Sequence, residues 1–230
     1  MEKQTILPSQ NRIMKMYLGT MHSGKSRELI KDMQQDAFPF KFLITPTLVE
    51  NKTKAIQVHT STGSDDFLIQ GNIFSIQDEL NRAKKDKSTL SICLYCDEIQ
   101  FFSSAEVNQI FDIIKNYNNV YFKLSGLEKD YLNRDFQAIK LIKEKANQNN
   151  LDTNITHLSC ICEECKNNKA EYNCLFNKKQ EIILKEGSSG VFNLETESKP
   201  KYKVLCQSCF NKEKLKLKNK TNKKEFSYGN

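Results

Sequence analysis

The sequence lacks any uninterrupted hydrophobic run near the roughly 20 residues that a membrane-spanning helix needs. Its opening residues, MEKQTILPSQNRIMKM, also lack the long apolar region that follows the basic start of a signal peptide. We therefore expect a cytoplasmic protein. In that setting the eight cysteines are expected to be metal ligands or free thiols rather than disulfides.

Net positive charge is small outside one end of the chain. The formal net charge is +7, but the last twenty residues alone contain seven lysines and two glutamates. The remainder has no dense Lys/Arg stripe with interleaved aromatics, which a nucleic-acid-binding surface would need. We expect residues 211–230 to form a solvated, partly disordered tail, and we expect no nucleic-acid partner.

Residues 1–150 alternate between strand-like and helix-like segments. Apolar runs predict buried strands at residues 12–18, 40–46, 88–98 and 120–126, and helical spacing predicts helices at 24–35, 104–116 and 136–148. The polar residues 47–66 are expected to form a loop or a short strand. This alternation predicts an α/β domain, a parallel sheet flanked by helices on both faces. Residues 151–210 have short strand signals and many cysteines, which predicts a small second lobe.

The first strand is followed by GTMHSGKS, which matches the phosphate-loop pattern G-x-x-x-x-G-K-[ST] at every fixed position. Such a loop wraps phosphates with backbone N–H groups, and the following helix adds its positive dipole end. Lys25 is expected to reach the β- and γ-phosphates of ATP, and Ser26 to bind Mg²⁺. The expected phosphate-binding residues are Gly19, Thr20, Met21, His22, Ser23, Gly24, Lys25 and Ser26.

Two adjacent acids end the third predicted strand, in the segment SICLYCDEIQFF. A nucleotide-binding phosphate loop needs an acid at the end of a neighbouring strand to hold Mg²⁺. We expect Asp97 to face the metal and Glu98 to act as a general base. The pair alone is a weak signal, and the phosphate loop makes it a strong one.

Two C-x₂-C pairs lie about forty residues apart, Cys162 with Cys165 and Cys206 with Cys209. Four thiolates at this spacing predict a closed, structural zinc site. Cys160 and Cys174 are alternative ligands, but the two pairs are the better match. Cys93 and Cys96 lie in a strand, where positions three apart point to opposite faces, so we expect buried thiols.

The phosphate loop, the DEIQFF strand end, the segment GLEKDYLNRDF and the four-cysteine lobe together resemble the type II thymidine kinases. The resemblance extends from about Ile13 to Phe210. It implies transfer of the γ-phosphoryl group of ATP to the 5′-hydroxyl of thymidine or deoxyuridine, in nucleotide salvage. It also implies a homotetramer and feedback inhibition by dTTP.

The resemblance carries roles to individual positions. Glu98 falls on the catalytic base, and Asp97 and Ser26 fall on the magnesium positions. A lasso loop, residues 187–202 here, closes over the nucleoside in that family. Phe102 is expected only to pack in the core. The implied nucleoside-binding residues are Met21, Phe101, Leu127, Tyr131, Phe136, Asn173 and Tyr202.

Around the nucleoside the sequence departs from the family pattern, although the catalytic positions match. Glu50 and Lys52 stand where an acid and an arginine are usual, and the lasso is longer by about ten residues. Further departures are Glu128, Leu132, Asn173, Leu175 and Gln207. Two alternatives stay open: a phosphate-loop ATPase whose zinc lobe binds nucleic acid, and a nucleoside-binding protein without catalytic activity.

Overall fold

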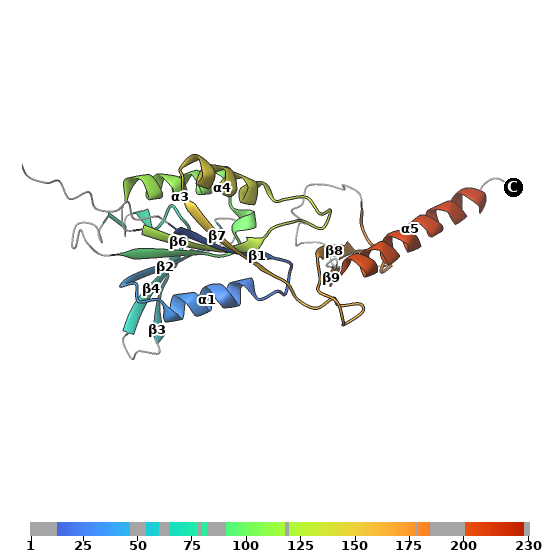
Figure 1. Cartoon of the computed structure of the whole chain (residues 1–230), viewed down its shortest axis with the longest axis horizontal. Coiled ribbons are helices and arrows are strands. Elements are labelled where there is room, and N and C mark those ends of the chain that lie inside the picture. The colour runs from blue at the N-terminus through green and yellow to red at the C-terminus, as the bar shows by residue number, and fades with distance from the viewer. Residues whose placement is uncertain are drawn as a thin grey trace, which may run out of the picture.

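The computed structural model describes residues 13–46, 54–59, 65–77, 80–81, 91–117, 120–177, 179–184 and 201–227. Along the chain the elements are β1 (Ile13–Gly19), α1 (Lys25–Gln35), β2 (Phe40–Ile44), β3 (Lys54–His59), β4 (Asp65–Gly71), β5 (Ile92–Cys96), the 3₁₀ turn η1 (Ile99–Phe101), α3 (Ser104–Asn116), β6 (Val120–Leu127), α4 (Gln137–Gln148), β7 (Asp152–Leu158), β8 (Tyr172–Phe176), β9 (Lys201–Leu205) and α5 (Gln207–Ser227). Figure 1 shows a main body, a sheet between layers of helices, with a smaller lobe at one end. This confirms the predicted α/β class.

The main sheet has seven strands in the order β3-β4-β2-β5-β6-β1-β7. Neighbouring strands run parallel, except that β3 pairs antiparallel with β4 at one edge. The strand β3 lies inside residues 47–66, where the sequence left open a loop or a short strand. Because β5, β6 and β1 are adjacent and parallel, their carboxyl ends bring residues from distant parts of the chain to one edge.

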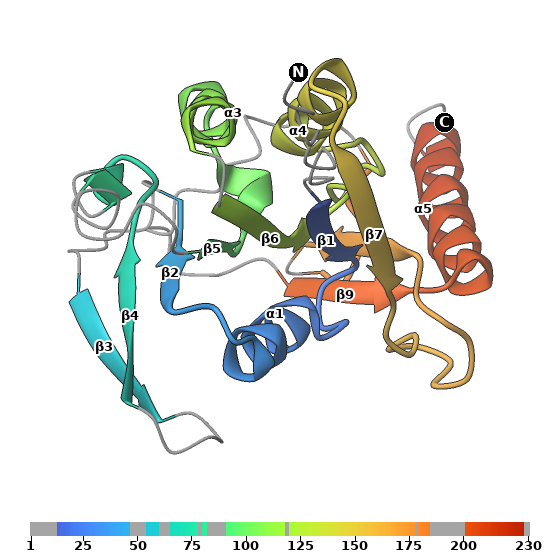
Figure 2. The ribbon, with the colours of Figure 1, turned by 60° about the vertical axis from the view of Figure 1, so that its left-hand side comes forward.

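Alternate side chains of the central strands pack on opposite faces of the sheet. Met16 and Cys96 lie in the larger core, which α3 and α4 cover. Tyr17 and Cys93 lie on the other face with Leu29 of α1. Figure 2 shows α1 on one side of the sheet and α3 and α4 on the other. Cys93 and Cys96 are therefore buried thiols on opposite faces, as predicted, and burial raises the pKa of Cys93 to about 12.

The strand β7 extends the main sheet past the boundary that the sequence predicted at residue 150. It pairs with β1 from Asp152 to Leu158 at the sheet edge. Most of its side chains are exposed or half-buried, and Ile155 is one of the few that pack on the core. An edge strand with this polar composition, DTNITHL, gives little hydrophobic alternation in the sequence, which explains why it was not predicted.

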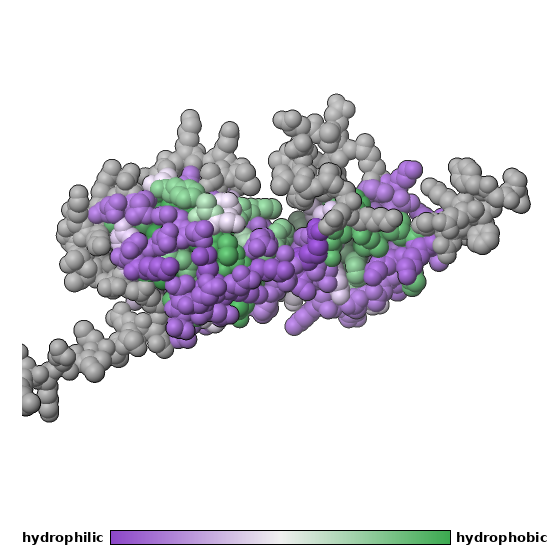
Figure 3. Space-filling model, turned by 90° about the horizontal axis from the view of Figure 1, so that it is seen from above, coloured by the Kyte–Doolittle hydropathy of each residue, from purple (hydrophilic) through white to green (hydrophobic). Residues whose placement is uncertain are grey.

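The smaller lobe is built on the antiparallel pair β8–β9 and a cysteine-containing turn. Its core contains Phe176, Ile182 and Leu205 beside Cys162, Cys174, Cys206 and Cys209. In the space-filling view from above, hydrophilic side chains run along the lower edge of both the body and the lobe (Figure 3). Three of these core cysteines belong to the two C-x₂-C pairs, so a metal held by those pairs would add to the stability of this small core.

The C-terminal segment differs from the expected disordered tail, because α5 continues from the lobe to Ser227. The ring of Phe210 stacks on Tyr172 with 4.3 Å between centroids, and Leu217 packs on the lobe core. Lys220 pairs with Glu181 at 3.0 Å. Lysine, leucine and glutamate are good helix formers, so a helix that starts against the lobe can continue beyond it. Figure 1 shows α5 extending away from the main body.

A group of charged side chains fastens α1 to the sheet. Asp32 accepts hydrogen bonds from Lys15 at 2.8 Å, Tyr17 at 2.7 Å and Lys123 at 2.9 Å. Lys123 also pairs with Asp36 at 2.7 Å. Burial alone would raise the pKa of Asp32, but these donors outweigh it and hold that pKa below its usual value. The helix that follows the phosphate loop is therefore tied to both β1 and β6.

This arrangement predicts that Asp32→Asn is less stable than the wild type near pH 7, and that the difference shrinks below about pH 4. A carboxyl with a lowered folded pKa stabilises the fold above its unfolded pKa of about 3.9, and this contribution is lost as the pH falls through the folded value. Urea unfolding at several pH values measures the difference, with the exposed Asp112→Asn as a control. A destabilisation that stays constant down to pH 3 would contradict the assignment.

Candidate active site

The predicted phosphate loop, residues 19–26, connects β1 to α1. Gly24 has φ 85°, a left-handed conformation that favours glycine. A Cβ on Gly19 would lie 2.0 Å from the carbonyl oxygen of Leu158 in β7, so only glycine fits there. Lys25 is 9% exposed, and its Nζ donates to the carbonyl of Thr20 at 2.6 Å. The ammonium thus lies within the curve of the loop.

Two opposing effects act on the pKa of Lys25. Burial lowers the pKa of the ammonium, while the nearby carboxylates of Glu98 and Asp97 oppose that shift. A cation in the curve of the loop suits a polyphosphate, because the ammonium can pair with phosphate oxygens.

Asp97 follows β5 and receives three hydrogen bonds on one oxygen. Ser26 donates to Oδ1 at 3.0 Å and the backbone N–H of Glu98 at 2.9 Å, and the hydroxyl of Ser125 in β6 donates to the same atom. The structure therefore brings together Ser26 and Asp97, the two residues predicted for Mg²⁺. A hydroxyl and a carboxylate are hard oxygen ligands of the kind that Mg²⁺ prefers, so the residues fit this ion. The contact from Ser125 was not predicted.

Glu98 is held by a residue that sequence reasoning missed. Its backbone has φ 53°, uncommon for a residue other than glycine, and it precedes η1. Gln100 is 5% exposed, donates from Nε2 to Glu98 Oε2, and accepts at Oε1 from the backbone N–H of Leu127 at 2.9 Å. The amide thus fixes the carboxylate of Glu98 against the end of β6. The available signal was the polar glutamine between apolar residues in DEIQFF.

The two phenylalanines that follow Glu98 have different surroundings. Phe102 is in the core, as expected. Phe101 is 43% exposed, and its ring meets Phe136 edge-on with 6.3 Å between centroids. Both line a cavity of about 740 Å³. An exposed phenylalanine beside a second ring at a cavity is free to stack on a flat ligand.

Two tyrosines expected near a nucleoside come together from different parts of the chain. Tyr131 follows β6 and is buried, and Tyr202 in β9 is half-buried. The pKa of Tyr202 is raised by burial first, and then by the proximity of Tyr131 and Asp130. The lobe therefore reaches the main body at this place. Glu50, Lys52 and residues 187–200 of the expected lasso lie outside the described residues.

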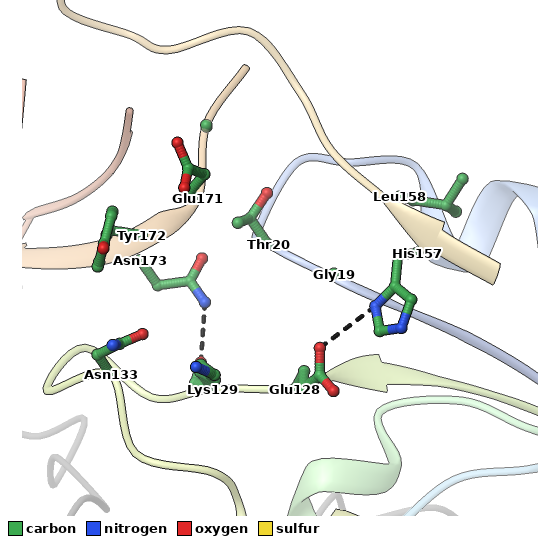
Figure 4. A pocket seen from close by; sticks show the side chains of 11 residues that line it. Gly19, Thr20, Glu128, Lys129, Asn133, His157, Leu158, Glu171, Tyr172 and Asn173 are labelled. Atoms are coloured by element: carbon green, nitrogen blue, oxygen red, sulfur yellow. Dashed lines mark hydrogen bonds and ion pairs between the residues drawn. The ribbon is translucent and has the colours of Figure 1, made fainter. Parts of the chain in front are cut away.

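A second cavity, of about 320 Å³, lies where the phosphate loop, β6, β7 and the lobe meet (Figure 4). On its floor Glu128 pairs with Lys143 at 2.7 Å and with Nδ1 of His157 at 3.3 Å. Glu128 thus ties the end of β6 to α4 and β7. Asn173 reaches the same cavity from β8, and its Nδ2 donates to the carbonyl of Lys129 at 2.9 Å.

The carboxamide of Asn173 was expected to serve a nucleoside, and its described contacts are to backbone. Its Oδ1 accepts from the backbone N–H of Met21 at 2.8 Å. An amide oxygen has a second lone pair and the nitrogen a second hydrogen, so capacity for a ligand is left. The nucleoside role of Asn173 remains a prediction, and its contact with the phosphate loop is an addition to it.

The four cysteines of the two C-x₂-C pairs form one cluster. The Sγ atoms of Cys162, Cys165, Cys206 and Cys209 lie within 4.8 Å of one another, and neither Cys160 nor Cys174 belongs to this group. The Sγ atoms of Cys165 and Cys206 are 3.9 Å apart. This is close to the roughly 3.8 Å between two sulfur ligands of a tetrahedral zinc ion with Zn–S bonds of about 2.3 Å. The four thiols therefore fit a structural zinc ion.

One thiol of this cluster has local support from the backbone. The N–H groups of Asn168 and Asn167 lower the pKa of Cys165 to about 6. Burial raises the pKa of Cys209 in the same cluster to about 12, as it does for Cys174 outside the cluster. The backbone turn thus favours a thiolate at Cys165.

The family model "Thymidine kinase" matches residues 12–210. The chain belongs to the thymidine kinase family. It is 24% identical over 216 residues to a thymidine kinase of Mesoplasma florum, an alignment that covers 92% of this chain and 98% of that protein. It is also 24% identical over 199 residues to a thymidine kinase of Mycoplasma mobile, with 86% of each chain covered.

Within the thymidine kinase family this chain is divergent, as the low identities show. The family match includes the phosphate loop, both acids and all four cysteines, and it ends at Phe210 near the start of α5. Most of α5 therefore lies beyond the part that the family model matches. In the described part of the chain, no helix combines the length and apolar character that crossing a membrane requires.

Proposed function

We propose that this chain is an ATP-dependent thymidine kinase that transfers the γ-phosphoryl group of ATP to the 5′-hydroxyl of thymidine or deoxyuridine. The observation that carries the proposal is the position of Glu98. Its carboxylate is oriented by Gln100 at the end of β5, and its charge acts on Lys25 of the phosphate loop. A base so close to a phosphate-binding lysine suits phosphoryl transfer to an alcohol.

In this mechanism the loop from Gly19 to Ser26 binds the phosphates of ATP, and Lys25 stabilises the charge that develops on the transferred group. Glu98 accepts or orients the proton of the 5′-hydroxyl, and Gln100 keeps its carboxylate in place. Ser26 and Asp97 would hold Mg²⁺, which would supply further neutralisation of phosphate charge.

The nucleoside would lie between the main body and the lobe. Phe101 is exposed beside the half-buried Phe136, and Tyr131 of the main body and Tyr202 of the lobe would be the aromatic contacts from the two sides. Met21, Leu127 and Asn173 complete the proposed pocket. Closure of residues 187–202 over the nucleoside would exclude water, the competing acceptor of the phosphoryl group.

Other parts of the proposal follow family membership. They are a homotetramer, feedback inhibition by dTTP, and a role in nucleotide salvage in the cytoplasm. Departures around the pocket, Glu128 and Asn173 among them, make the choice between thymidine and deoxyuridine the point that needs measurement.

The test is a coupled assay of ADP release with MgATP and thymidine, deoxyuridine, deoxycytidine or no nucleoside. The proposal predicts release that depends on thymidine or deoxyuridine and that is near background with deoxycytidine. Release that ignores every nucleoside but rises with DNA would favour a nucleic-acid-stimulated ATPase. ATP binding without any release would favour a nucleoside-binding protein without catalytic activity.

A further inference from the structure

Both backbone polar groups of Met21 in the phosphate loop are bound by side chains that follow β7 in the chain. Its N–H donates to Asn173 Oδ1 at 2.8 Å, and its carbonyl accepts from Cys160 Sγ at 3.3 Å. Asn173 lies in β8 of the small lobe, and Cys160 lies just before the first zinc-cluster cysteine. We call this pair of contacts the Met21 clasp.

The carboxamide of Asn173 is buried and its orientation is determined by its partners. The residue is 7% exposed, and its Nδ2 donates to the carbonyl of Lys129 at 2.9 Å. Because Met21 offers a donor and Lys129 an acceptor, only one orientation of the amide satisfies both. Figure 4 shows this amide between Thr20 and Lys129. One side chain therefore joins the phosphate loop, the segment after β6 and the lobe.

The clasp is one residue away from the contact that places Lys25. Thr20 Oγ1 lies 3.6 Å from Cys160 Sγ, and the carbonyl of Thr20 accepts from Lys25 Nζ at 2.6 Å and from Ser23 Oγ at 2.8 Å. A shift of Met21 would therefore move the carbonyl to which Lys25 is bound. A phosphate loop must hold its donors and its lysine in the correct geometry. A loop that is already ordered also loses less entropy when ATP binds.

We infer that Asn173 and Cys160 are positioning residues that fix the phosphate loop from the lobe, so that affinity for ATP depends on the Met21 clasp. The inference rests on the proposed function, since it assumes that the loop binds ATP. It assigns the lobe a role beyond covering the nucleoside: the lobe shapes the binding site of the phosphoryl donor.

The test measures MgATP binding to the full, zinc-loaded chain by titration calorimetry. Asn173→Asp keeps the size and the acceptor for Met21 but turns a carboxylate oxygen toward the carbonyl of Lys129. We expect its Kd for MgATP to rise at least about tenfold, the scale of a buried polar group that loses its partner. Cys160→Ala should raise Kd about two- to fivefold, whereas Cys160→Ser, which keeps a donor, should stay near the wild type.

Asn177→Asp is the matched control for the stability of the lobe. Asn177 lies in the same lobe and organises a turn through its contacts with Lys179 and Glu181, without touching the phosphate loop. It should bind MgATP as the wild type does. Zinc content is measured for every variant and should equal that of the wild type. This distinguishes weaker ATP binding caused by a shifted loop from weaker binding caused by unfolding of the lobe.

The double variant Asn173→Asp with Cys160→Ala tests whether the two contacts act together. Because both bind the same residue, the combined loss should be smaller than the sum of the two single losses. Equal affinity of the wild type and Asn173→Asp, or an equal loss in Asn177→Asp, would overturn the inference. If the wild type itself fails to bind MgATP, the proposed function fails instead.

Discussion

Replacing Glu98 by glutamine is expected to reduce thymidine-dependent ADP release by about a hundredfold to ten thousandfold, the range for loss of a general base. The amide keeps the size of the carboxylate but cannot accept the proton of the 5′-hydroxyl. Affinity for MgATP should change little, because the phosphate loop and Asp97 are untouched. Steady-state rates with saturating thymidine and MgATP measure the effect, beside a separate ATP titration.

Glu144→Gln provides the control for this substitution. Glu144 is exposed on α4, so its loss of charge should leave the rate near that of the wild type. If Glu98→Gln retained more than about a tenth of the wild-type rate, Glu98 would not be the base.

Replacing Cys162 by serine is expected to release zinc and to unfold the small lobe. Cys162 is fully buried in the four-cysteine cluster, and its neighbours in the lobe core include Phe176 and Leu205. Zinc ligation supplies apparent folding free energy on the order of 10 kcal/mol in small domains, more than a core of this size supplies alone. Metal analysis and limited proteolysis measure the two effects, and a chelator should reproduce them in the wild type.

Cys174→Ala is the matched control, since Cys174 is buried in the same lobe core but lies outside the cluster. It should retain one zinc per chain and lose only the stability of a small buried side chain, about 1 kcal/mol. Unchanged zinc content and protease resistance in Cys162→Ser would show that these cysteines do not hold a structural metal. Loss of zinc in both variants would equally contradict the predicted ligand set.

Local patterns in the sequence locate the candidate site, whose individual roles remain predictions. The phosphate loop, the acids after β5 and the two cysteine pairs each occupy a few consecutive residues, and the chemistry of each needs fixed spacing. The alternation of Cys93 and Cys96 across the sheet follows from the two-residue period of a strand. For these features, neighbouring residues in sequence are also neighbours in space.

The features that were missed depend on contacts between distant residues or on context. Asn173 and Met21 are 152 positions apart, so their hydrogen bond has no sequence signature. Cys160 was considered only as a zinc ligand, and its contact with the loop depends on how the chain leaves β7. The lysine-rich composition of residues 211–230 predicts a disordered tail, whereas in the structure α5 includes residues up to Ser227 and the stack of Phe210 on Tyr172 holds its first turn to the lobe.

The most direct test of the central claim is identification of the product formed from thymidine and MgATP by mass spectrometry. The account predicts thymidine 5′-monophosphate in amounts equal to the ADP formed, and at least about a hundredfold less of it with Glu98→Gln over the same time. Unmodified thymidine beside consumed ATP would contradict the claim, because the phosphoryl group would then have gone to another acceptor.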